Sequence, residues 1–399
     1  MDEAPRPATA KPAPGGVLSG AGFRLGRILG LEVTLDASWL VIFALVTFSL
    51  ATGFGAQHPG SDPAVRWLAA FAASLAFFAS ILLHEMSHSW VARLRGLGVH
   101  GITLFIFGGV SRLKEEPRRP RDEFVIAVVG PLMSGALGGL FLLARRAAPA
   151  DTLLVSALGW LGAVNLLLAV FNLLPGFPLD GGRIFRAVVW AFTGNLRKAT
   201  RAAARGGAAI AYGLMLWGAY TAFVAGQLVN GLWLGFIGWF LLSASQKTVA
   251  QMELRSILGS LRVSQALRPD CAVAGPEETV ARFVDDQVLR TAGRCAFVSD
   301  GGALLGLVTL HELRKVAREA WPSTRLGDVM VPFERLRRVA PDDTLLTALE
   351  RMNEGPVNQL PVLEGRSLLG IVTREDVLRF VALHLELGRD GGVAGPTAS

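Results

Sequence analysis

Long apolar segments recur through about the first 245 residues and restrict the fold more than any other feature of this sequence. A bilayer core about 30 Å thick is crossed by roughly 20 apolar residues in a helix. Backbone groups in lipid find no water to bind, so an isolated apolar segment crosses as a helix, whose hydrogen bonds are internal. Six spans are predicted, at about residues 39–55, 67–91, 124–144, 153–174, 207–224 and 228–245. We therefore expect a polytopic α-helical membrane protein.

The composition changes at about residue 249, where the chain becomes an ordinary soluble sequence. Residues 302–313 recur 64 residues later as residues 366–377, and both copies contain Leu-Leu-Gly followed by Val-Thr. Each copy predicts a helix, a strand, a turn, a second strand and a helix, and two such units can pair into one α/β module. We expect four parts: a flexible tail at 1–20, a membrane domain at 21–248, the α/β domain at 249–388 and a flexible tail at 389–399.

An H-E-x-x-H pattern lies inside the second apolar segment, at His84, Glu85 and His88. Residues four apart lie on one face of a helix, so both imidazoles can reach one metal ion, and zinc suits this spacing best. The two cysteines, Cys271 and Cys295, lie in the soluble part, so the metal must use nitrogen and oxygen ligands. Glu85 can take a proton from a water on the metal and later give it to a leaving amine. Such groups are expensive to bury in lipid, which favours a functional site over a chance match.

A catalytic zinc site needs a third protein ligand beside an open position. Asp180 follows a helix break made by prolines and glycines, where unwound backbone lets a carboxylate reach inward. It is favoured over His58, expected across the membrane, and over His100, expected at a solvated strand edge. Helix N-capping is the structural alternative for Asp180. Asn172, eight residues earlier, is a candidate for holding a substrate carbonyl or oxyanion, with an interhelical hydrogen bond as its alternative.

Basic residues are distributed unevenly between the two sides of the apolar segments, which predicts orientation in the membrane. Segments on one side hold 17 Lys or Arg and those on the other hold 3, so both termini are expected in the cytoplasm of a cell-membrane protein. The net charge of +7 then reflects topology, and no direct contact with nucleic acid is expected. Residues 99–110 are β-prone and glycine-rich and predict a short hairpin beside the site, while residues 22–34 predict an edge strand or turn.

Several of these features together resemble the site-2 protease family of intramembrane zinc metalloproteases. They are the H-E-x-x-H motif, the Gly108-Gly109 strand, Gly130-Pro131 and the stretch from Asn172 to Asp180-Gly181. The resemblance implies zinc held by His84, His88 and Asp180, with Glu85 as general base or acid. It also implies cleavage within a span of a membrane protein, such as an anti-sigma factor or a membrane-tethered regulator. Ser134 stands where members of this family often have an asparagine.

The repeated segments resemble a tandem pair of cystathionine-β-synthase-type (CBS) domains, which often bind adenine nucleotides. Thr373 and Asp376 in the second copy match the positions that hold ribose and phosphate, and Thr309 and Glu312 are their counterparts in the first. The resemblance implies ATP, ADP or AMP as ligands and a homodimer formed through these domains. A module that only dimerises is the alternative.

Two functions of different class fit the sequence. The first is an intramembrane zinc endopeptidase controlled by its cytoplasmic module. The second is a non-proteolytic metal-binding receptor or transporter in the membrane. Glu85 discriminates between them, because a structural metal site needs no base next to an open coordination position.

Overall fold

The computed structural model describes residues 22–28, 30–105, 108–113, 116–268, 272–290, 295–301, 303–355, 357–365 and 367–390. The tail expected at residues 1–20 lies outside these residues, as does the tail expected at 389–399 except for its first two residues, which end a helix. The chain divides into two compact units between Met252 and Glu253.

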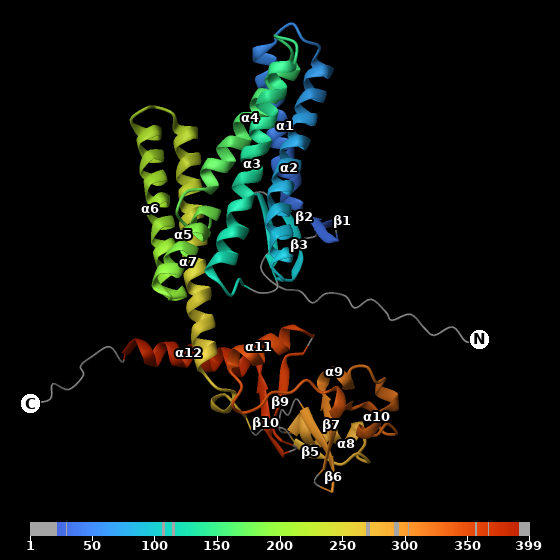
Figure 1. Ribbon diagram of the computed structural model, residues 1–399. Coiled ribbons are helices and arrows are strands. Elements are labelled where there is room, and N and C mark those ends of the chain that lie inside the picture. Colours follow the sequence, from blue (N-terminus) through green and yellow to red (C-terminus); the bar gives the residue numbers. More distant parts are fainter. Residues whose placement is uncertain are drawn as a thin grey trace, which may run out of the picture. The chain divides into compact units, whose positions relative to one another are not determined.

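The membrane unit is helical over most of its described length (Figure 1). Its helices are α1 (Ala37–Gln57), α2 (Pro63–Leu94), α3 (Pro120–Ala147), α4 (Leu153–Asn172), α5 (Asp180–Thr193), α6 (Leu196–Phe223) and α7 (Leu228–Ser260), of which the part from Glu253 on belongs to the C-terminal unit. Within the described residues, α1, α2, α3, α4 and α7 are long and apolar enough to cross a membrane. The fifth predicted span falls in α6, whose first turns are basic and whose remainder is rich in glycine and alanine. The multi-pass helical fold is confirmed, with five helices meeting the span criterion where six were expected.

Glycines bring neighbouring helices into close contact. A Cβ added to Gly138 on α3 would lie 3.1 Å from the Gly162 carbonyl oxygen on α4, and the reverse distance is 3.3 Å. Likewise, a Cβ at Gly218 on α6 would lie 2.6 Å from the Gly231 oxygen on α7. Small residues at these crossings allow backbones to approach as membrane helices commonly do. Helix α2 contacts α1, α3 and α4, so the H-E-x-x-H segment lies in the middle of a bundle.

A four-stranded sheet in the order β1-β2-β3-β4 lies against α2. Its strands are β1 (Phe23–Ile28), β2 (Leu31–Leu35), β3 (Val99–Phe105) and β4 (Gly108–Leu113). The hairpin expected at 99–110 is present as β3 and β4, but β3 also pairs in parallel with β2, which the sequence did not predict. Leu31, Ile102 and Leu104 of the sheet pack on Phe78 and Ile81 of α2. This packing brings β4, at one edge of the sheet, beside the motif on α2.

The C-terminal unit contains the predicted repeat. The first copy runs through β5 (Ala272–Ala274), α8 (Val280–Phe283), β6 (Cys295–Asp300), β7 (Ala303–Thr309) and α9 (Leu310–Leu313). The second runs through α11 (Leu345–Asn353), β9 (Gln359–Glu364), β10 (Ser367–Thr373) and α12 (Arg374–Asp390). Each copy has its own apolar core, and Phe297 and Leu307 of the first hairpin pack against Ile371 of the second. The predicted pairing of two α/β repeats is therefore confirmed.

Candidate metal centre

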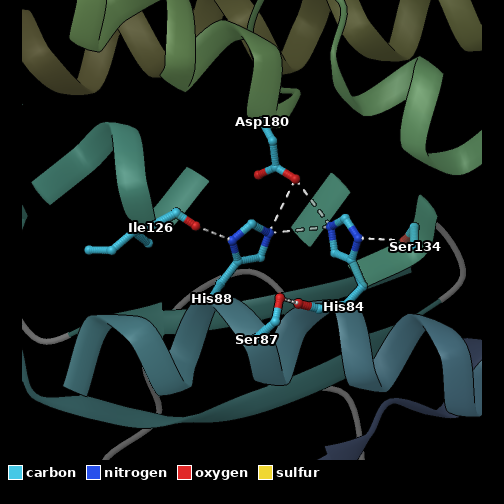
Figure 2. Close-up of polar contacts among 6 residues, drawn as sticks. All are labelled: His84, Ser87, His88, Ile126, Ser134 and Asp180. Atoms are coloured by element: carbon cyan, nitrogen blue, oxygen red, sulfur yellow. Dashed lines mark hydrogen bonds and ion pairs between the residues drawn. The ribbon is translucent and has the colours of Figure 1, made fainter. Parts of the chain in front are cut away.

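Three side chains from two distant segments bring metal-binding atoms together in the membrane unit (Figure 2). His84 and His88 lie one turn apart on α2 and are buried, and Asp180 is the first residue of α5. The Asp180 Oδ2 lies 3.1 Å from the His84 Nε2 and 3.2 Å from the His88 Nε2, and the two Nε2 atoms are 3.3 Å apart. The three atoms form a nearly equilateral triangle.

The triangle fits a zinc ion. Ligand atoms of a tetrahedral zinc site, at bond lengths of about 2.0–2.1 Å, lie about 3.3 Å from one another. Gly130 on α3 borders the same space, because a Cβ there would lie 2.2 Å from the His88 Nε2 and 2.7 Å from the His84 Nε2. The absence of a side chain at Gly130 therefore keeps room beside the ligand nitrogens. Two nitrogens and one carboxylate oxygen are also a ligand set that catalytic zinc uses.

Both imidazoles are oriented through their Nδ1 atoms. The His88 Nδ1 lies 2.6 Å from the carbonyl oxygen of Ile126, which can only accept, so His88 donates there and its Nε2 is free to bind a metal. The His84 Nδ1 lies 2.9 Å from the Ser134 Oγ. Figure 2 shows these two partners on the outer sides of the rings, away from Asp180. The sequence singled out Ser134 but did not predict its contact with His84, and it gave no signal for Ile126.

Close backbone contacts place Asp180. A Cβ on Gly181 would lie 2.3 Å from the Leu173 oxygen, and a Cβ on Gly182 would lie 2.4 Å from the Gly176 carbonyl carbon. These glycines let the start of α5 pack directly on the segment that follows α4. Leu179 occupies the N-cap position, so the N-cap alternative for Asp180 is wrong.

Glu85 points toward the edge strand β4. A Cβ on Gly109 would lie 2.5 Å from the Glu85 Cγ and 3.2 Å from its Cδ, so a side chain at that strand position would displace the carboxylate. The Ser111 backbone hydrogen-bonds to Glu85, and the Ser111 Oγ lies 2.8 Å from the Ser89 Oγ on α2. Strand β4 therefore fixes the surroundings of a carboxylate that lies next to His84 in the chain and is half-buried.

The other candidates of the membrane unit lie elsewhere. His58 is the C-cap residue of α1, and its Nε2 lies 2.8 Å from the Ser156 Oγ on α4. His100 is exposed on β3. Neither belongs to the group of residues that meets around Asp180. Asn172 is half-buried at the last residue of α4, and its role stays a prediction.

The paired threonines and acidic residues of the C-terminal unit cap the N-termini of helices. The Asp376 Oδ2 accepts hydrogen bonds from the Thr373 backbone nitrogen at 3.3 Å and from its Oγ1 at 2.5 Å. The Glu312 Oε2 accepts from the Thr309 backbone nitrogen at 3.2 Å, and from its hydroxyl. Asp376 is buried, and its Oδ1 lies 2.7 Å from the Arg268 Nε. Both carboxylate oxygens of Asp376 are thus already engaged.

Known proteins resemble this chain over most of its length. The family model described as Peptidase family M50 matches residues 72–147 and 135–214, and these ranges include His84, His88 and Asp180. A Mycobacterium tuberculosis protein named as the zinc metalloprotease Rip3 is 38% identical over 367 residues, which are 90% of this chain and 93% of that protein. The chain belongs to peptidase family M50. A zinc metalloprotease of Methanocaldococcus jannaschii is 26% identical over 364 residues, covering 91% of this chain and 97% of the relative.

Two further comparisons cover parts of this M50 peptidase. A solved site-2 protease from Methanocaldococcus jannaschii is 26% identical, covers 57% of this chain and 95% of its own, and has a TM-score of 0.40. The family model for the CBS domain matches residues 326–383, in the second repeat. The protein is thus a multi-pass membrane zinc metalloprotease with a CBS domain. This result decides for the enzyme over the receptor or transporter.

Proposed function

We propose that this peptidase cuts its substrates within the membrane, using a zinc ion held by His84, His88 and Asp180. The observation that carries the proposal is the triangle of ligand atoms, with edges of 3.1 to 3.3 Å, in which two of the atoms belong to α2, a helix long and apolar enough to span a bilayer. Zinc at such a site supplies Lewis-acid polarisation and an activated water at neutral pH. The three side chains hold the ion and leave a coordination position for chemistry.

Glu85 is the proposed general base and acid. Its carboxylate takes a proton from the attacking water and later gives it to the nitrogen of the leaving amine. Gly109 on β4 leaves room for the Glu85 side chain, and the Ser111 backbone hydrogen-bonds to its carboxylate. Asn172 stays a candidate for binding the oxygen of the scissile carbonyl, because it lies on the last turn of α4, just before the segment that leads to Asp180.

The test is Glu85→Gln in the purified full-length protein, assayed on a reporter membrane span in detergent. The amide keeps the size of the side chain but cannot accept the proton, so cleavage should fall by about 10²- to 10⁴-fold. Zinc content should stay unchanged, since both imidazoles and Asp180 remain. Near-normal cleavage with zinc retained would rule out the general-base role.

The proposed substrates are membrane proteins cut inside a span, such as an anti-sigma factor or a membrane-tethered regulator. A helical span shields its amides through internal hydrogen bonds, so it must unwind locally before a carbonyl reaches the site. The uneven distribution of basic residues supports placing both termini in the cytoplasm, with the metal centre nearer that face. The proposed layout is a protease domain over residues 21–248 and a regulatory CBS pair over 249–388, between short terminal tails.

The proposed regulator is an adenine nucleotide, ATP, ADP or AMP, with Thr373 and Asp376 as its main contacts and Thr309 and Glu312 as a weaker second site. The CBS family match and the repeat support this proposal. A nucleotide can shift the protease between two states only by the difference between its affinities for them. Because Arg268 is paired with Asp376, a ribose that uses the same carboxylate shares it with that guanidinium or displaces it. We propose that the effect of the nucleotide reaches the membrane unit through pairing of two chains by their repeats.

A further inference from the structure

A buried ion pair joins α3 to α5 beside the metal centre. Glu123 in the first turn of α3 has 0% of its surface exposed, and the Arg186 side chain on α5 has 11% exposed. The Arg186 Nε donates to the Glu123 Oε1 over 2.6 Å, and its Nη2 contacts the same oxygen. Burying two charges is so costly that apolar replacements are often neutral or stabilising, so stability alone explains this pair poorly.

The two charged residues lie on the segments that shape the metal centre. Glu123 is three residues, or about one turn, before Ile126, whose carbonyl oxygen accepts the hydrogen bond that orients His88. Arg186 is six residues after Asp180 on the same helix. The pair therefore connects the backbone that orients one ligand with the helix that presents another.

Arg186 also reaches the other side of Asp180. Its guanidinium carbon lies 5.2 Å from the centre of the Phe177 ring, and Phe177 is buried three residues before Asp180. A planar guanidinium can stack on a ring while it donates through two nitrogens, which a lysine cannot do. Arg186 thus holds α5 against α3 and holds the loop before α5 at the same time.

We propose that Glu123 and Arg186 are a positioning pair for the metal centre, holding Asp180 where its oxygen is within 3.1 to 3.2 Å of both Nε2 atoms. The inference rests on the proposed zinc site and adds two residues to it that touch neither the metal nor the substrate. Neither residue belongs to the H-E-x-x-H motif or to the break before Asp180. Their effect acts through the geometry of the ligands.

The experiment measures zinc affinity of the full-length protein in detergent by competition with a chromophoric chelator. Glu123→Leu combined with Arg186→Met replaces the pair with apolar side chains and leaves no unpaired charge, so the fold should persist. Zinc affinity should fall by about 10- to 100-fold, the range for removing groups that support metal ligands. Arg186→Lys, which keeps the charge, should give a smaller loss. In both, kcat should fall while KM changes little, because the pair is proposed to act on the geometry of the metal ligands.

Asp122→Asn is the matched control. Asp122 is the neighbour of Glu123, and its Oδ1 pairs with the Arg95 Nη1 over 2.8 Å at a partly exposed position. This control should keep parental zinc affinity. If the apolar pair and Arg186→Lys also keep zinc affinity within about twofold, or lose zinc only in proportion to unfolded protein, the positioning role is wrong. Asp180→Ala separates the two proposals: zinc retained there refutes the metal site, whereas zinc lost there but kept in the ion-pair variants refutes only this inference.

Discussion

The metal centre and the Thr-acid pairs of the CBS repeats use their polar side chains in opposite ways. In the membrane unit, His84, His88 and Asp180 turn their free ligand atoms toward one another, and partners from α3 occupy the Nδ1 atoms of both rings. In the C-terminal unit, the carboxylates of Asp376 and Glu312 bind the start of their own helix. Helix capping explains the second arrangement. It does not explain the first, in which the ligand atoms of separate segments face one another. A motif argues for a ligand most strongly where local structure leaves its atoms unused.

The largest predicted effect comes from closing the space beside the ligand nitrogens. Gly130→Ala places a methyl group 2.2 Å from the His88 Nε2, so an imidazole must move. Zinc affinity should fall by more than roughly 100-fold, since even indirect support of a ligand is worth 10- to 100-fold. Alanine favours helix over glycine, so α3 should not be weakened. Zinc content measured after dialysis checks this.

Gly135→Ala is the matched control on the same helix, because a Cβ at Gly135 meets nothing within 4 Å. It should bind zinc as the parent does. Equal zinc affinity in Gly130→Ala and Gly135→Ala would mean that the ion does not lie beside Gly130.

A smaller effect is predicted for the support of His84. Ser134→Ala removes the oxygen 2.9 Å from the His84 Nδ1, so the ring loses its orientation and zinc affinity should fall by about tenfold. Ser87→Ala is the control, because the Ser87 hydroxyl donates to the His84 backbone oxygen within α2 (Figure 2). Chelator competition should separate the two serines. An equal effect of both variants would contradict the orienting role of Ser134.

The smallest effect tests the C-terminal side of the comparison. Thr373→Ala removes the side chain that caps α12, so the free energy of unfolding of the C-terminal unit should fall by about 1 kcal/mol. Thr309→Ala should cost a similar amount in the first repeat. Hydrogen exchange of the full-length protein, followed by mass spectrometry of peptides from each repeat, measures the two losses separately.

Nucleotide titration of the same full-length variants tests whether the Thr-acid pairs also bind a ligand. If the pairs also bind ribose, calorimetry with ATP, ADP and AMP should show that Thr373→Ala weakens binding more than Thr309→Ala does. Binding to none of the three nucleotides would remove the regulatory proposal and leave helix capping as the whole role of these residues.

The sequence predicted those parts of the site that are adjacent in the chain or next to an obvious helix break. His84, Glu85 and His88 follow from one turn of helix, and Asp180 follows from the prolines and glycines before it. Ser134 and Ile126 lie 50 and 38 residues from the histidines they orient, and such contacts depend on how α3 packs on α2. The parallel pairing of β2 with β3 joins segments on either side of two helices. No local pattern encodes distances of that kind.

For the fold too, the sequence predicted features that are continuous in the chain but not contacts between distant segments. Apolar length located the helices, and α6, where the fifth span is predicted, does not meet the span criterion among the described residues, because its glycines and alanines are apolar without being strongly hydrophobic. The repeat located the paired hairpins of the C-terminal unit because each hairpin is continuous in sequence. The pairing of Arg268 with Asp376 joins residues 108 positions apart, and no local pattern predicts it.

The most direct test of the three-ligand metal centre is the zinc content of Asp180→Ala compared with that of His100→Ala, each purified as the full-length folded protein. Two histidines alone hold zinc weakly, so Asp180→Ala should lose most of its zinc and its cleavage activity together. His100 is exposed on β3 and away from the triangle, so His100→Ala should keep the parental zinc content. Full zinc in Asp180→Ala together with zinc loss in His100→Ala would contradict the account.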